Sequence, residues 1–170
     1  MIHGKNIIHT IGHIMYIILY CSLIIVCFFY SQAYLKPFLY LGLVILVLGI
    51  TFVIWTSLSR RKGCILAEKS ISKENLVKSG PYAFVRHPEF LGHILIVSGL
   101  VLISQLWISL FVGVILIVLL YIAMLDEEKK NIEKFGAAYE DYMKKVPRIN
   151  LLAGIIRQMR CKKKKVRHKW

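Results

Sequence analysis

Acidic residues are scarce in this chain of 170 residues. Nine Asp and Glu stand against 23 Lys and Arg, and no acidic residue precedes Glu68. The long apolar runs hold no Asp, Glu, Lys or Arg near their centres. Transporters typically place charged side chains at mid-membrane, so this absence argues against a transport role.

Paired cysteines and complete metal-ligand sets are also absent. No CxxC pair occurs, so the cysteines indicate neither a zinc site nor a disulfide framework. His9 and His13 lie one helical turn apart, which is a metal-ligand spacing, but no carboxylate or thiolate accompanies them. We therefore expect these two histidines to anchor the chain at a membrane interface, and we expect no metal. The cysteines are Cys21, Cys27, Cys64 and Cys161.

Apolar residues are abundant, at 57% of the chain, with a mean hydropathy of +0.62. They occur in blocks of about 20 residues, which is the length that a membrane-spanning helix needs. We predict an all-α fold, a polytopic bundle of about four transmembrane helices in a single integral membrane domain. The expected spans are 7–30, 38–58, 89–104 and 106–125, and the third is short for a full span.

Basic residues flank these runs. One Lys precedes the first run, one lies in the linker 31–37, seven lie within 59–86, none lies near 105 and fourteen follow 125. The positive-inside rule then predicts that both termini are cytoplasmic, with the plasma membrane as the default location. The formal charge of +14 also fits nucleic acid, but its position beside the spans favours anionic lipid headgroups.

The segments outside the spans have distinct characters. Residues 59–88 read as a solvated cytoplasmic loop, and apolar residues at spacings of three and four predict an interfacial amphipathic helix over 129–146, ended by Pro147. Residues 157–170 form a basic tail, which we expect to grip anionic lipid.

Two polar clusters flank the expected helical hairpin. Arg86-His87-Pro88 precedes the third run, and Pro88 suits the first position of a helix. Glu127 and Glu128 follow the fourth run at a helix C-terminus, where carboxylates are unfavourable unless a cation is near; Arg86 and a bound ligand are both candidates. The hairpin would bring both clusters to one side of the membrane. Such a site would combine carboxylates, a guanidinium, an imidazole and nearby aromatic rings.

These residues resemble a known family. The matching pattern is similar to the isoprenylcysteine carboxyl methyltransferase and phospholipid methyltransferase superfamily, over about the C-terminal half of the chain. Phe90 stands where the family often has Tyr, which keeps the ring but removes a hydroxyl donor. The pattern comprises Gly80, Tyr82, Arg86-His87-Pro88, Phe90 and Gly92, then Glu127-Glu128, Phe135-Gly136, Tyr139, Tyr142 and Pro147-Arg148.

The resemblance implies an integral membrane methyltransferase that takes S-adenosylmethionine from the cytoplasm and a lipophilic acceptor from the bilayer. The acceptor classes are a prenylcysteine carboxylate, a phospholipid amine or a thiol. Arg86, His87 and Glu128 are the implied catalytic residues. Either both carboxylates meet the methionine portion of the cofactor, or Glu128 fixes Arg86 instead. The implied cofactor-binding residues are Tyr82, Val85, Arg86, His87, Pro88, Phe90, Glu127 and Glu128.

Two alternatives remain at this stage. Membrane reductases of related fold use NADPH, although this chain is short for that role. A non-catalytic small membrane protein would explain the spans and the tail but gives no reason for the two polar clusters to coexist. No nucleic-acid or metal partner is expected under any of these hypotheses.

Overall fold

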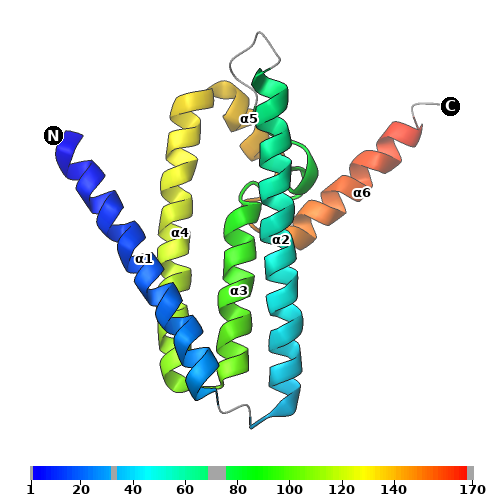
Figure 1. Cartoon of the computed structure of the whole chain (residues 1–170). Helices are drawn as coiled ribbons and strands as arrows, with labels where there is room; N and C mark the ends of the chain where they lie inside the picture. The colour runs from blue at the N-terminus through cyan, green and yellow to red at the C-terminus, as the bar shows by residue number, and fades with distance from the viewer. Residues whose placement is uncertain (1, 32–33, 69–75, 168–170) are drawn as a thin grey trace. The chain divides into compact units, whose positions relative to one another are not determined.

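The computed structural model describes residues 2–31, 34–68 and 76–167, with side chains for 14–31, 34–62 and 76–160. Every regular secondary-structure element over these residues is a helix, so the predicted all-α class is confirmed (Figure 1). The elements are α1 (Ile2–Tyr30), α2 (Lys36–Glu68), the 3₁₀ turn η1 (Gly80–Ala83), α3 (Pro88–Ser104), α4 (Trp107–Phe135), α5 (Ala137–Lys145) and α6 (Leu151–Arg167).

Two of the described helices are long and apolar enough to cross a membrane. These are α2 over Lys36–Lys62, with 27 residues, and α4, with 29. The apolar part of α1, Ile14–Tyr30, and the whole of α3 are shorter. A bundle of four spans therefore stays a prediction for α1 and α3.

The structure corrects two of the expected boundaries. Residues 59–68 are not loop, because α2 continues to Glu68; Arg and Lys are good helix formers, so the basic run does not end the helix. The helix expected over 129–146 is divided at Gly136, whose φ of 52° lies in the left-handed region. The basic tail from 157 is helical as far as Arg167.

The contacts of the backbone divide the chain into two compact units. The first unit comprises Met1–Gly49 and His93–Ile122, and the second comprises Ile50–Gly92 and Ala123–Trp170. Helices α2, α3 and α4 each contribute one part to each unit. All residues of the sequence-predicted site belong to the second unit.

Close helix packing holds the first unit together. Leu23, Val97, Leu100 and Leu116 form its buried core. A Cβ added to Gly42 would lie 2.9 Å from the backbone oxygen of Gly99, so α2 and α3 approach as closely as small residues permit.

The two turns of the first unit are joined by the side chain of Gln105. Its Oε1 accepts from the backbone N–H of Leu35 at 2.9 Å, and its Nε2 donates to the Leu35 carbonyl at 2.9 Å. Ser31 donates to the Ile103 carbonyl at 3.1 Å, which ties the end of α1 to the end of α3 (Figure 1). Ser31 and Leu35, which lie on either side of residues 32 and 33 in the sequence, are therefore both hydrogen-bonded to residues 103–105 at the end of α3.

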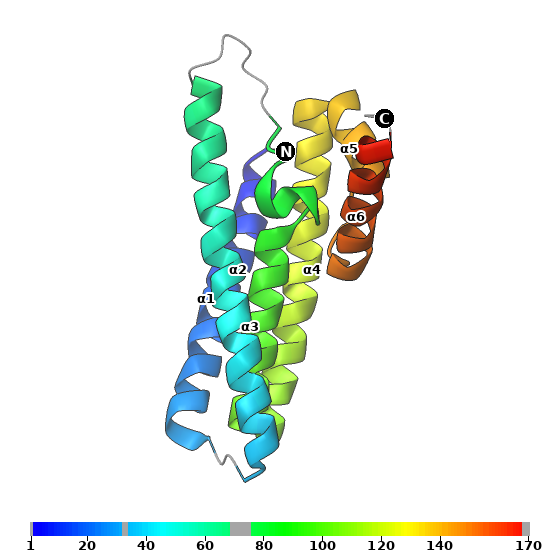
Figure 2. The same cartoon turned by 90° about the vertical axis from the view of Figure 1, so that its right-hand side faces the viewer.

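The second unit has its own core, built on α5. Tyr139, Tyr142 and Val146 are at most 5% exposed, and Ile132 and Met143 pack against them. The apolar stripe predicted to face a membrane interface is thus buried in protein. In this unit α6 lies beside α5, as Figure 2 shows, and Arg157 of α6 donates to the Lys145 carbonyl at 2.6 Å.

Candidate functional site

The segment 80–87 begins with a tight turn against α2. Gly80 has φ of 64°, a left-handed conformation that favours glycine, and Pro81 opens the 3₁₀ turn. A Cβ at Gly80 would lie 2.8 Å from Oγ of Ser59. The helical extension of α2 past residue 58 therefore provides the wall on which the turn rests.

The end of the segment is fixed by the chain just after α5. The backbone N–H of Arg86 donates to the Pro147 carbonyl at 2.9 Å, and that of His87 donates to the Arg148 carbonyl at 3.1 Å. Pro88 is the first residue of α3, as predicted, since its missing N–H costs nothing there. Arg86 and His87 are thus held at the entrance of α3.

Side chains of α5 and α6 hold the middle of the segment. Tyr142 Oη donates to the Tyr82 carbonyl at 2.7 Å. Arg157 Nη2 and Gln158 Nε2 both donate to the Ala83 carbonyl, at 2.7 and 2.8 Å. Gly154 faces the Phe84 backbone with no room for a Cβ. The segment is therefore clamped from one end to the other.

Glu128 is the centre of a buried ion cluster. Its Oε1 lies 2.8 Å from Arg86 Nη1, and its Oε2 lies 2.6 Å from Arg148 Nη2. The side chains of Arg86 and Glu128 are 8% and 6% exposed, whereas that of Arg148 is 34% exposed. Of the two alternatives drawn from the sequence, the geometry supports the one in which the second carboxylate fixes Arg86.

His87 packs against the same carboxylate as a neutral ring. Its Nε2 lies 3.6 Å from Glu128 Oε1, and its side chain is 2% exposed. Burial lowers the pKa of His87 from 6.5 to about 4; Glu128 opposes this shift, and the charges of Arg86 and Arg148 reinforce it. At neutral pH the imidazole is therefore uncharged and can serve as a hydrogen-bonding group.

The neighbouring carboxylate has the opposite environment. Glu127 is exposed, because adjacent helical residues point about 100° apart. In the same unit, Arg60 and Glu89 form an ion pair with two contacts. Arg60 Nη1 lies 2.9 Å from Glu89 Oε2, and Arg60 Nη2 donates to Glu89 Oε1 at 3.2 Å. Burial raises the pKa of Tyr82 to about 12, so its hydroxyl remains a donor at neutral pH. Two carboxylates adjacent in sequence thus have separate environments.

The remaining predicted residues fall into two groups. Val85 and Pro88 are buried, so their side chains support the segment from within. Phe90 and Tyr82 are partly exposed, and the Phe90 ring lies edge-on to His87 with centroids 5.8 Å apart. Only the second group presents side-chain surface that a ligand could contact.

Several buried polar atoms around Glu128 lack a hydrogen-bond partner within the described part of the chain. They include Arg86 Nε, His87 Nε2 and Tyr139 Oη. An unsatisfied buried polar group costs about 1–3 kcal/mol, which a polar ligand or water offsets by bonding to it. The exposed Glu127 carboxylate lies at the surface and suits a ligand that carries an ammonium group. No cluster of three or more His, Cys, Asp or Glu able to hold a metal ion occurs among residues 14–31, 34–62 and 76–160, whose side chains the structure describes.

Comparison with protein-family models identifies the family of this chain. The family model for phospholipid methyltransferase matches residues 37–139, which is more than half of the chain. The chain belongs to the phospholipid methyltransferase family. The family is part of the superfamily of integral membrane methyltransferases that the motifs indicated, and it makes this chain a membrane methyltransferase. Neither curated proteins nor solved structures give a significant match.

For this phospholipid methyltransferase family member, the sequence-based site lacked three residues that the structure adds. Arg148 shares the Glu128 carboxylate with Arg86, and Arg157 and Gln158 hold Ala83. Arg148 belongs to the Pro147-Arg148 motif, which was the available signal. Arg157 and Gln158 lie in a segment interpreted from its basic residues as a tail, and no motif marks them there.

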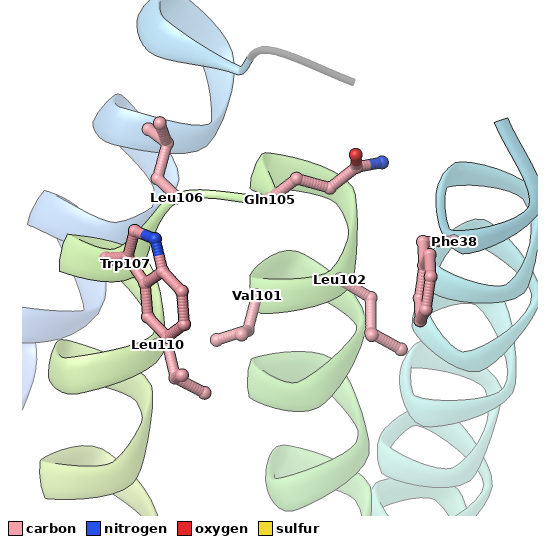
Figure 3. A pocket seen from close by; sticks show the side chains of 7 residues that line it. All are labelled: Phe38, Val101, Leu102, Gln105, Leu106, Trp107 and Leu110. Atoms are coloured by element: carbon pink, nitrogen blue, oxygen red, sulfur yellow. The ribbon is translucent and has the colours of Figure 1, made fainter. Parts of the chain in front are cut away.

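The first unit of this family member contains a cavity of a different kind. It has a volume of about 200 Å³ and lies beside the Gln105 turn, and Figure 3 shows its apolar walls. It offers no titratable side chain and one amide, so its lining suits hydrocarbon contact. None of the sequence-predicted site residues lines it. The lining residues are Phe38, Val101, Leu102, Gln105, Leu106, Trp107 and Leu110.

Proposed function

We propose that this protein transfers a methyl group from S-adenosylmethionine to a lipophilic acceptor, with its site in the second unit. The observation that carries the proposal is the cluster in which Glu128 holds Arg86 and Arg148. A buried carboxylate shared by two guanidiniums fixes both, so that their remaining donors meet a ligand without further ordering. Membership of the family supports methyl transfer as the reaction.

We assign different residues of the site to different groups of the cofactor. The sulfonium of S-adenosylmethionine supplies an electrophilic methyl group. We assign the exposed Glu127 to the ammonium of the methionine portion of the cofactor. We assign Arg86 to its carboxylate, because the N–H at Arg86 Nε has no hydrogen-bond partner within the described part of the chain. Glu128 and His87 then act as positioning residues, while Tyr82 and Phe90 offer ring surface to the rest of the ligand. The protein contributes orientation and exclusion of water.

The acceptor determines whether a base is needed. A carboxylate attacks without losing a proton, whereas a protonated amine or a thiol must lose one first. The pKa of His87, lowered to about 4, makes the ring a weak base. We therefore place His87 in a positioning role. The family name favours a lipid amine among the three acceptor classes.

We further propose that the site faces the cytoplasm. The second unit carries Arg60, Arg86 and all fourteen of the basic residues that follow Leu125, and the positive-inside rule places such segments on the cytoplasmic side. The plasma membrane is the default location. In this orientation the site takes S-adenosylmethionine from the cytoplasm.

A methyl-transfer assay tests the proposal. The purified chain in lipid nanodiscs is incubated with methyl-labelled S-adenosylmethionine, and the label in extracted lipid is counted. We expect transfer that falls at least tenfold in Glu127→Gln and is unchanged in Glu133→Gln, which removes an exposed carboxylate of the same helix. NADPH consumption without label transfer would instead favour a reductase, and inactivity toward both would favour a non-catalytic role.

A further inference from the structure

Helix α6 has two opposite faces, and protein covers one of them. The covered face contacts the backbone of residues 83 and 84 through Gly154, Arg157 and Gln158. The opposite face carries Leu152, Ile156 and Met159, which are 73%, 51% and 59% exposed. With 3.6 residues per turn, the two sets fall on opposite sides of the helix. The apolar stripe Leu152-Ile156-Met159 is thus left uncovered within the second unit.

The charge of α6 indicates what covers this stripe. The helix contains no acidic residue, and the exposed Arg160 is followed in the sequence by four consecutive lysines, 162–165. A helix with an apolar stripe and a run of cations is suited to the surface of an anionic bilayer, where the stripe enters the acyl boundary and the cations meet headgroups. A membrane protein has such a surface nearby.

We propose that α6 docks on an anionic lipid surface through the Leu152-Ile156-Met159 stripe, and that this docking steadies the segment 80–87. The connection is direct. Arg157 and Gln158, on the covered face, donate to the Ala83 carbonyl, four residues before His87. Fixing the helix from its outer face restricts the motion of these two donors, and so of the segment they hold.

Hydrogen exchange of the full chain tests the proposal independently of methyl transfer. Exchange of the peptides covering 151–160 and 80–87 is measured by mass spectrometry in nanodiscs of phosphatidylcholine, with and without one third phosphatidylglycerol. We expect anionic lipid to slow exchange in both peptides at least threefold. Met159→Ser and Ile156→Ser should each remove this slowing, whereas Ala153→Ser, an exposed change off the stripe, should keep it.

A coupling variant separates docking from its effect on the segment. Gln158→Leu removes one donor to Ala83, so α6 should still gain protection on anionic lipid while 80–87 gains less. Equal exchange in both lipid mixtures would overturn the docking. Slower exchange in α6 with no change in 80–87 in the unaltered chain would overturn the coupling. Protection of α6 that rises with protein concentration in lipid-free detergent would point to a second copy of the chain instead.

Discussion

At the scale of single residues, Glu128 organises the site. It brings together Arg86, which lies before the hairpin of α3 and α4, and Arg148, which lies after α5. Arg86 was a candidate cation from the sequence, but on the premise that the acidic cluster ends a helix. Helix α4 continues to Phe135, so the burial of Glu128, and not the helix dipole, is what requires the cation. The division of roles between Glu127 and Glu128 could not be predicted, since it depends on which face of α4 the second unit covers.

Replacing Glu128 should cost both stability and ligand affinity. Glu128→Gln leaves two guanidiniums without their shared carboxylate. Breaking a buried ion pair lowers the free energy of unfolding by about 3 kcal/mol. This value is the lower end of the usual range, which we choose because Arg148 is partly exposed. The thermal unfolding midpoint in detergent should fall, whereas Glu133→Gln should leave it in place. An unchanged midpoint in Glu128→Gln would mean that the cluster does not stabilise the fold.

His87 should make stability depend on pH in a defined window. Its pKa is about 4 in the folded protein against an ordinary 6.5, so the unfolded chain binds the extra proton first. The contribution of the neutral ring is complete above pH 6.5 and is lost as the pH falls toward 4. Unfolding midpoints of His87→Asn should fall less steeply across this window than those of the unaltered chain. Parallel curves for the two proteins would contradict the account.

At the scale of elements, helix boundaries were the part least accessible from the sequence. Apolar runs predicted the cores of α2, α3 and α4, but Arg60, Arg61 and Lys62 were interpreted as the start of a loop although such residues extend a helix readily. The break at Gly136 depends on a left-handed backbone conformation, and no proline marks the break in the sequence. The first departure matters for the site, since the extension of α2 supplies Ser59 and Arg60.

Gly154 tests the contact between α6 and the segment 80–87. A methyl group there meets the Phe84 carbonyl, so Gly154→Ala should loosen the helix from the segment although alanine favours helix by about 1 kcal/mol. Hydrogen exchange of 80–87 in detergent should become faster. Ala153→Ser adds an atom at an exposed position of the same helix, away from the segment, so it should leave that exchange unchanged. Equal exchange in Gly154→Ala and the unaltered chain would rule out the clamp.

At the scale of the whole molecule, the sequence predicted the all-helical class and the family; the structure confirms the class and the family model confirms the family. Hydropathy sufficed for the class because only helices satisfy the backbone of long apolar runs in lipid. The division into two units could not be predicted, because α2, α3 and α4 each pass from one unit to the other without a change in composition that marks the boundary.

The proposed orientation makes a prediction for the full chain in the membrane of intact cells. In a chain without its own cysteines, Tyr34→Cys lies in the linker expected outside, and Lys129→Cys lies beyond the apolar part of α4. A maleimide that cannot cross membranes should label Tyr34→Cys from outside intact cells and Lys129→Cys only after permeabilisation. The reverse pattern would place the site on the outer face.

The central claim is that the site built on Glu127 and Glu128 binds S-adenosylmethionine. Calorimetric titration of the detergent-solubilised chain with S-adenosylmethionine, S-adenosylhomocysteine and NADPH tests it most directly. We predict binding of both adenosyl ligands and not of NADPH, with at least tenfold weaker binding of S-adenosylmethionine to Glu127→Gln and unchanged binding to Glu133→Gln. Binding of NADPH alone, or equal affinity of S-adenosylmethionine for both variants, would contradict the account.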